Sequence, residues 1–246
     1  AWGACMAGLL YSKYHGILVI GFTVLSNLQL LRRPKFYLAA LWRALLFSPH
    51  LFWQIDNNFP SFRYHILQRS NFFEWKDLYS YLINQLVIYN PFIFPLLIIA
   101  LIRRQPAADQ LQKKTERTYT FNIIGFWLFF FAMILRGHVE PQWTAVLSIP
   151  LAVLAYRYGL EHPSYQRRLR NLVLISLLPL LALRVLIMKG VLEEQIPLFH
   201  KRHWAYELEK EVEDLPVLFL NSFRGPSTYE FYTGNQTAAV NTVTAK

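Results

Sequence analysis

Long apolar runs, separated by short basic clusters, constrain this chain more than any other feature of its sequence. A run of roughly 18 or more apolar residues predicts a membrane-spanning helix, because about 20 residues at about 1.5 Å rise cross the hydrocarbon core. Six segments meet or approach this length: residues 16–31, 36–53, 78–102, 119–135, 144–156 and 172–188. The first extends toward Ala7 if the membrane tolerates Lys13 and His15. The sequence therefore predicts an all-α integral membrane protein with about six transmembrane helices over residues 1–188.

The composition agrees with this fold class. Hydrophobic residues make up 54% of the 246 residues and charged residues 16%, whereas an ordinary soluble domain has about 25% charged residues. The formal net charge of +10 also occurs in nucleic-acid-binding proteins, but here the basic residues lie in short clusters between apolar runs, which is typical of cytoplasmic loops. We therefore expect membrane lipids as partners and no nucleic acid. The single cysteine, Cys5, excludes an internal disulfide.

The distribution of basic residues predicts an orientation. The loops at 32–35, 103–117 and 157–170 hold three, five and four Lys or Arg residues. The alternate loops at 54–77 and 136–143 hold three and one. Because Lys and Arg accumulate in cytoplasmic loops, we expect the first set in the cytoplasm. The second set and both ends of the chain are then expected on the extracytoplasmic side.

The segment 189–246 differs in character and is predicted to be a separate extracytoplasmic domain. Residues 215–220 have the length and composition of a strand, and residues 227–232 those of a short helix. Strand, turn and helix begin a small α/β domain, whose partner strands we expect beyond Lys246. Together with the abrupt start at Ala1, this predicts that the chain is a piece of a longer protein, cut at both ends.

The end of the first predicted span carries a lysine that suits a phosphate-bearing lipid. Lys13, followed by Tyr14 and His15, stands where a cation is costly unless it reaches the headgroups or meets an anion. One interpretation is a lysine that snorkels to the headgroups beside an interfacial tyrosine. The other is a lysine that binds the phosphate of a lipid-linked substrate, because the lipid tail holds that phosphate at headgroup depth.

Further charged residues gather in the two predicted outer loops. Arg63 lies among aromatic residues, which is typical of an interfacial loop. The alternative is a re-entrant or membrane-surface helix that lines a substrate cleft, with Arg63 or Arg69 facing phosphate. Arg136, His138 and Glu140 lie within eight residues that end at Trp143. One interpretation is a polar turn anchored by the tryptophan, but a plain turn needs no basic, imidazole or carboxylate side chain. The other is a loop that contributes to a substrate site. No metal-ligand spacing such as H-E-x-x-H occurs, so no metal or cofactor site is predicted, and a need for a divalent metal stays open.

Three motifs, in the same order along the chain, are similar to those of one protein family. Gly8-Leu-Leu-Tyr-Ser-Lys-Tyr-His-Gly16 is similar to the helix start "GLA-x-L-(S/T)-K-Y", and Gly137-His-Val-Glu-Pro-Gln-Trp143 to the loop "K-x-E-x-x-W". Pro216 to Ser222, with Phe231 to Gly234, is similar to the opening of the family's outer soluble segment. The chain thus resembles the C-terminal portion of the bacterial membrane glycosyltransferases of family 39, the group related to protein O-mannosyltransferases and to the aminoarabinose transferase of lipid A.

The resemblance implies an enzyme of the GT-C type. Such enzymes transfer a sugar from a polyprenyl-phosphate-linked donor to a lipid, glycan or protein acceptor at the outer face of the bacterial cytoplasmic (inner) membrane. The family's catalytic Asp or Glu lies in a first outer loop, which we expect upstream of Ala1, so this chain alone is expected to transfer no sugar. Lys13, Glu140 and Trp143 match motif positions, and the family's usual basic residue is replaced by His138 or displaced to Arg136.

No catalytic residue is therefore expected in this chain. Taken together, motif and position predict a set of substrate-binding residues: Lys13, Tyr14, His15, Arg63, Arg136, His138, Glu140 and Trp143. Two other function classes stay open, a transporter or flippase of lipid-linked saccharide and a non-catalytic membrane assembly subunit. Pro91 and Pro95 interrupt one predicted span, as in the broken helices of transporters, but no internal repeat accompanies them.

Overall fold

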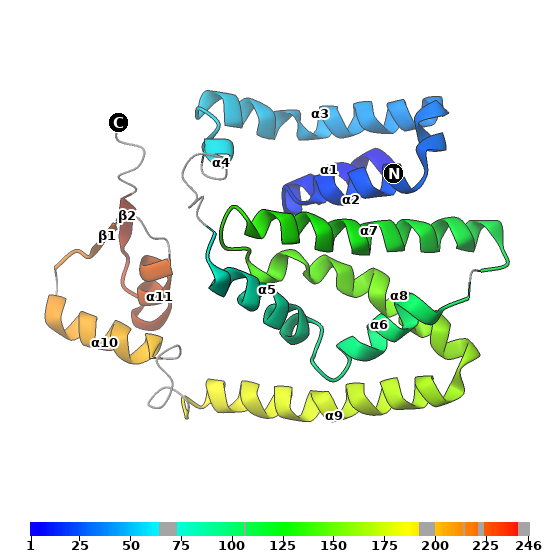
Figure 1. Ribbon diagram of the computed structural model, residues 1–246. Helices are drawn as coiled ribbons and strands as arrows, with labels where there is room; N and C mark the ends of the chain where they lie inside the picture. Colours follow the sequence, from blue (N-terminus) through cyan, green and yellow to red (C-terminus); the bar gives the residue numbers. More distant parts are fainter. Residues whose placement is uncertain (64–72, 106, 192–199, 214, 221–223, 241–246) are drawn as a thin grey trace. The chain divides into compact units, whose positions relative to one another are not determined.

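The computed structural model describes the chain except for residues 64–72, 106, 192–199, 214, 221–223 and 241–246 (Figure 1). The described residues are mostly helical, with two short strands near the C-terminus. They form two compact units, residues 1–173 and 174–246, each described here by itself. The sequence predicts a domain boundary after Met188, whereas the division between the two units falls inside the helix Pro163–Met188.

The first unit is a bundle of helices joined by short turns. Its α-helices are α1 (Trp2–Ser12), α2 (Gly16–Ser26), α3 (Pro34–Asp56), α4 (Pro60–Arg63), α5 (Trp75–Ile88), α6 (Phe94–Arg103), α7 (Gln110–Ile134), α8 (Ser148–Glu161) and the start of α9 (Pro163–Met188). Three 3-10 turns connect them: η1 (Leu28–Arg32), η3 (Pro141–Trp143) and η4 (Ala145–Leu147). In this unit α1 packs on α3, α2 on α7, and α6 on α8.

Helix α7 forms the centre of the first unit, between α2 and α8 (Figure 1). Its buried residues Ile123, Phe126, Phe130 and Ile134 recur every three or four positions and therefore lie on one face of the helix. Leu151 of α8 is fully buried in the same core cluster. The apolar run predicted at 119–135 is thus the middle and end of a longer helix.

Two helices among the described residues, α7 and α9, are long and apolar enough to cross a membrane by length and composition. They have 25 and 26 residues and contain the runs predicted at 119–135 and 172–188. The prediction of about six such helices is therefore too high. The four other apolar runs form helices that are shorter or more polar than a span requires.

Two of those runs are broken by turns. The run 16–31 gives α2, whose 11 residues span about 16 Å, followed by a 3-10 turn. Its expected extension toward Ala7 fails because the chain reverses at residues 13–15 and Lys13 adopts an extended backbone. The run 78–102 gives α5 and α6, because Pro91 disfavours a helical Asn90, which has a φ of 66°.

The other two runs differ in length or polarity. Helix α3 has 23 residues, but Lys35, Arg43 and Asp56 lower its hydropathy. The run predicted at 144–156 contains the 3-10 turn η4 before α8 begins at Ser148, which leaves a helix of 14 residues. Neither helix therefore meets the length and composition of a membrane span.

A close approach of backbones closes the turn between α1 and α2. A Cβ at Gly16 would lie 2.5 Å from the carbonyl oxygen of Leu9, whereas a Cβ at Gly21 would meet nothing within 4 Å. Gly16→Ala is therefore expected to lower the free energy of unfolding by about 1–3 kcal/mol. Gly21→Ala, on the same helix, is expected to raise it by about 0.5–1 kcal/mol. Thermal unfolding in detergent compares the two variants, and equal shifts would contradict the close approach.

The second unit ends in a small parallel βαβ arrangement. After α10 (Lys201–Val212) come β1 (Leu218–Leu220), α11 (Arg224–Thr233) and β2 (Ala238–Val240). Leu218 pairs with Ala238 and Leu220 with Val240. The sequence correctly predicts a strand followed by a short helix, although the strand is shorter than 215–220. The expectation that its partner strand lies beyond Lys246 is wrong.

The partner strand β2 is held in place by a side chain of the crossover helix. The Glu230 carboxylate accepts a hydrogen bond from the Thr237 backbone N–H at 2.8 Å and one from the Thr237 hydroxyl at 3.1 Å. These bonds fix the chain one residue before β2 begins. Parallel strands need such a crossover connection, and α11 supplies it.

Candidate functional site

The turn between α1 and α2 presents the first predicted motif at one end of the helical bundle. The Lys13 side chain is exposed, next to the reversal of the chain. The Tyr14 hydroxyl lies 2.6 Å from Nε2 of His50 and accepts a hydrogen bond of 2.6 Å from the buried Gln54 amide. The turn is therefore fastened to the C-terminal part of α3.

His15 connects this turn to the second predicted motif. Its ring centroid lies 4.7 Å from that of Trp143 and 5.2 Å from that of Phe130, and the rings of Phe130 and Trp143 are 5.5 Å apart. Phe130 is fully buried on α7, so it provides a fixed base for the other two rings. Two motifs separated by about 120 residues of sequence thus meet in one aromatic cluster of His15, Phe130 and Trp143.

Two contacts hold the loop between α7 and α8 against α5. Thr144 is fully buried, and its hydroxyl donates to Oε1 of Gln85 at 3.0 Å, while its carbonyl oxygen accepts from the Tyr89 hydroxyl at 2.5 Å. Nearby, Nδ1 of His138 lies 3.4 Å from Oδ1 of Asp77, a carboxylate that is buried at the start of α5. This loop is therefore anchored at two points, which fixes the position of Trp143.

The remaining predicted residues occupy different surroundings. Glu140 is half-buried and precedes η3, where its carbonyl oxygen accepts a hydrogen bond from the Trp143 backbone N–H at 3.1 Å. Arg136 is exposed at the start of the loop. Arg63 is exposed at the end of α4, and no contact among the described residues joins it to the aromatic cluster. Most of the loop that follows Arg63 lies outside the described residues.

The sequence did not predict His50, Gln54 or Asp77 as residues of this site. His50 and Gln54 sit four residues apart and therefore share one face of α3. This spacing within an otherwise apolar stretch is a signal that could have found them. Asp77 carried no such signal, because its partner His138 is 61 positions away in the chain. Only the tertiary structure joins this pair.

The site combines an exposed ammonium group, an aromatic surface and polar side chains. Such a set can bind a phosphate through the cation and a sugar ring through the aromatic faces. Among the described residues, no group of three or more His, Cys, Asp or Glu side chains could hold a metal ion. The chemistry that these residues support is therefore binding and orientation of an anionic, ring-containing substrate.

Comparison of the chain with protein-family models, with curated proteins and with solved structures finds no match. The resemblance to family 39 glycosyltransferases therefore rests on the three sequence motifs alone.

Proposed function

We propose that this chain belongs to a membrane glycosyltransferase that takes a sugar from a polyprenyl-phosphate-linked donor and acts at the outer face of the bacterial cytoplasmic membrane. The observation that carries the proposal is the contact between His15 and Trp143, with ring centroids 4.7 Å apart. It brings together two motifs that were each related to such enzymes by sequence. The acceptor in this proposal is a lipid, a glycan or a protein.

In the proposed site Lys13 binds the phosphate of the donor. When the sugar is transferred, its bond to the phosphate oxygen breaks and the lipid phosphate leaves with additional negative charge. A cation close to that oxygen stabilises the charge as it develops. The aromatic cluster provides a face on which the sugar ring stacks, and Glu140, three residues before Trp143, accepts a hydrogen bond from a sugar hydroxyl.

Exposed apolar surface supports the membrane part of the proposal. Only 6% of the most apolar stretch of 18 residues in α9 is buried. Large side chains such as Leu178 and Met188 are exposed at 69% and 76%. Water alone is a poor surrounding for such a surface. We further propose that α5 and α6 form one crossing, since broken helices are tolerated in a membrane where neighbouring helices satisfy the backbone.

Contacts within the first unit support the proposed topology. The loops predicted to be cytoplasmic are joined by the ion pair of Glu116 with Arg157. Residues predicted to be extracytoplasmic are joined by the pair of Asp77 with His138. In the proposal the end of the bundle with the Glu116–Arg157 pair faces the cytoplasm. The end with the Asp77–His138 pair lies on the extracytoplasmic side, as do residues 189–246.

Binding of a lipid-linked sugar tests this function without requiring turnover. The purified chain, in phosphatidylcholine nanodiscs, is titrated with a polyprenyl-phosphate-linked hexose, and binding is followed by quenching of tryptophan fluorescence. We expect saturable binding, because Trp143 lines the proposed site. Phosphatidic acid serves as the control, since it carries a phosphate and lipid tails without a sugar. Equal responses to both lipids, or none to the hexose donor, would remove the support for the proposal.

A further inference from the structure

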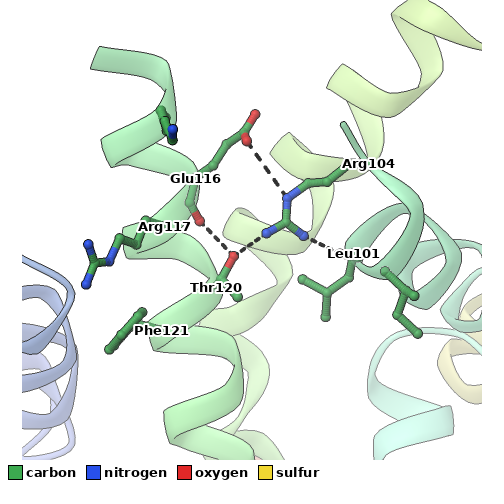
Figure 2. Close-up of a pocket in the computed structure, with 8 residues that line it drawn as sticks. Leu101, Arg104, Glu116, Arg117, Thr120 and Phe121 are labelled. Atoms are coloured by element: carbon green, nitrogen blue, oxygen red, sulfur yellow. Dashed lines mark hydrogen bonds and ion pairs between the residues drawn. The ribbon is translucent and has the colours of Figure 1, made fainter. Parts of the chain in front are cut away.

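A second charged site lies at the opposite end of α7 from Lys13. It is an open pocket of about 330 Å³ between the end of α6 and the first turns of α7 (Figure 2). Three basic side chains line it, Arg104, Lys113 and Arg117. Its apolar lining comes from Leu101, Ile102 and Phe121.

One buried carboxylate is shared by two guanidinium groups at this pocket. Glu116, which is 7% exposed, forms an ion pair with Arg157, and its other oxygen lies 3.9 Å from Nε of Arg104. Arg104 also donates to the Thr120 hydroxyl at 2.5 Å and to the carbonyl oxygen of Leu101, as Figure 2 shows. A single negative charge thus faces two positive charges, which leaves a net positive charge beside the pocket.

Two further cations add to this excess. Within the described part of the chain, no ion pair involves Lys113 or Arg117. The guanidinium of Arg117 lies 5.4 Å from the centroid of the Phe121 ring, a cation–π contact that leaves its charge in place. Burial lowers the pKa of Arg104, and the charge of Arg157 lowers that pKa further, as expected where positive charge is in excess. The pocket therefore attracts anions.

The apolar wall distinguishes a lipid from a small soluble anion. Ile102 is 74% exposed and Phe121 38% exposed, beside the cations rather than apart from them. The pocket also lies where the charged first turns of α7 give way to its apolar remainder, which is the level of the headgroups if α7 crosses a membrane. Cations beside exposed hydrocarbon suit a phosphate that carries acyl chains.

We propose that this pocket binds the phosphate of an anionic phospholipid, with Lys113 and Arg117 as its direct cationic ligands and Ile102 and Phe121 against the acyl chain. The inference rests on α7 lying in a membrane and not on sugar transfer. Its site shares no residue with the proposed donor site around Lys13. A failure to bind the sugar donor therefore leaves the lipid site unaffected, and a failure to bind phospholipid at the pocket leaves the donor site unaffected.

Titration of the purified full chain in a non-ionic detergent tests this inference. The probes are dioctanoyl phosphatidylglycerol, dioctanoyl phosphatidylcholine and inorganic phosphate, and binding is followed by microscale thermophoresis. The double variant Lys113→Ala/Arg117→Ala removes two exposed pocket cations. The control Arg103→Ala/Lys114→Ala removes the same charge from neighbouring exposed residues that do not line the pocket.

We expect the pocket variant to bind phosphatidylglycerol about 30-fold more weakly than the unmodified chain, since each of its two basic residues contributes about a fivefold factor near a membrane surface. The control variant is expected to change this affinity less than threefold. Equal losses in both variants would show a diffuse charge effect and overturn the pocket. Binding of inorganic phosphate as tight as that of phosphatidylglycerol would overturn the lipid as ligand, as would equal binding of phosphatidylcholine.

Discussion

Glu116→Gln is expected to destabilise the first unit by about 3 kcal/mol, measured as a lowered unfolding temperature in detergent. The substitution keeps the size of the side chain but removes the carboxylate that Arg157 and Arg104 share. Removing one partner of a buried ion pair costs about 3–5 kcal/mol, because the other charge stays buried without compensation. The lower end of this range applies because the Arg157 side chain is 28% exposed.

A matched control for this variant is Glu161→Gln, which makes the same chemical change at an exposed position of α8. We expect its unfolding temperature to be close to that of the unmodified chain, because surface charges contribute little. Equal unfolding temperatures of the two variants would contradict this prediction. In that case the guanidinium groups of Arg104 and Arg157 would be solvated well enough to need no carboxylate.

Lys13→Ala is expected to weaken use of the lipid-linked donor by about 10- to 150-fold in the active enzyme. A charge-assisted contact to phosphate contributes about 1.5–3 kcal/mol, and about 1.4 kcal/mol corresponds to a factor of ten. Because Lys13 is proposed to bind the leaving phosphate, the loss is expected in kcat/KM for the donor. Steady-state transfer at varied donor concentration measures it.

Two further variants separate phosphate binding from a general effect of charge. Lys35→Ala removes an exposed cation at the other end of the bundle and is expected to leave kcat/KM for the donor unchanged. Lys13→Arg keeps the charge and is expected to retain most of the activity. Normal kinetics in a folded Lys13→Ala variant would favour the alternative, in which Lys13 only snorkels to the headgroups.

Local sequence signals predicted where helices form more accurately than how long each helix is. The apolar runs at 119–135 and 172–188 became α7 and α9, because helical periodicity and uninterrupted hydrophobicity act within one segment. The run at 78–102 did not remain one helix. Pro91 disfavours a helical Asn90, and the left-handed backbone of Asn90 separates α5 from α6.

The candidate site shows the same division. Lys13 and Trp143 were selected by their residue types, while the placement of His15 against Trp143 came from packing of α2 on α7. His50 and Gln54 entered the site only because the turn at Tyr14 reaches the end of α3. Contacts between residues far apart in sequence carry no local signal that a single sequence can display.

The sequence by itself determined that this chain is mostly helical, is rich in apolar segments, and has a strand followed by a helix within residues 215–234, because hydrophobic periodicity and turn residues act over a few positions. The tertiary structure alone decided which of those segments end early, that β2 pairs with β1, and that Glu116 holds two arginines together. Each of these outcomes depends on close packing or on charge pairing between distant residues, and such energies exist only once the chain has folded.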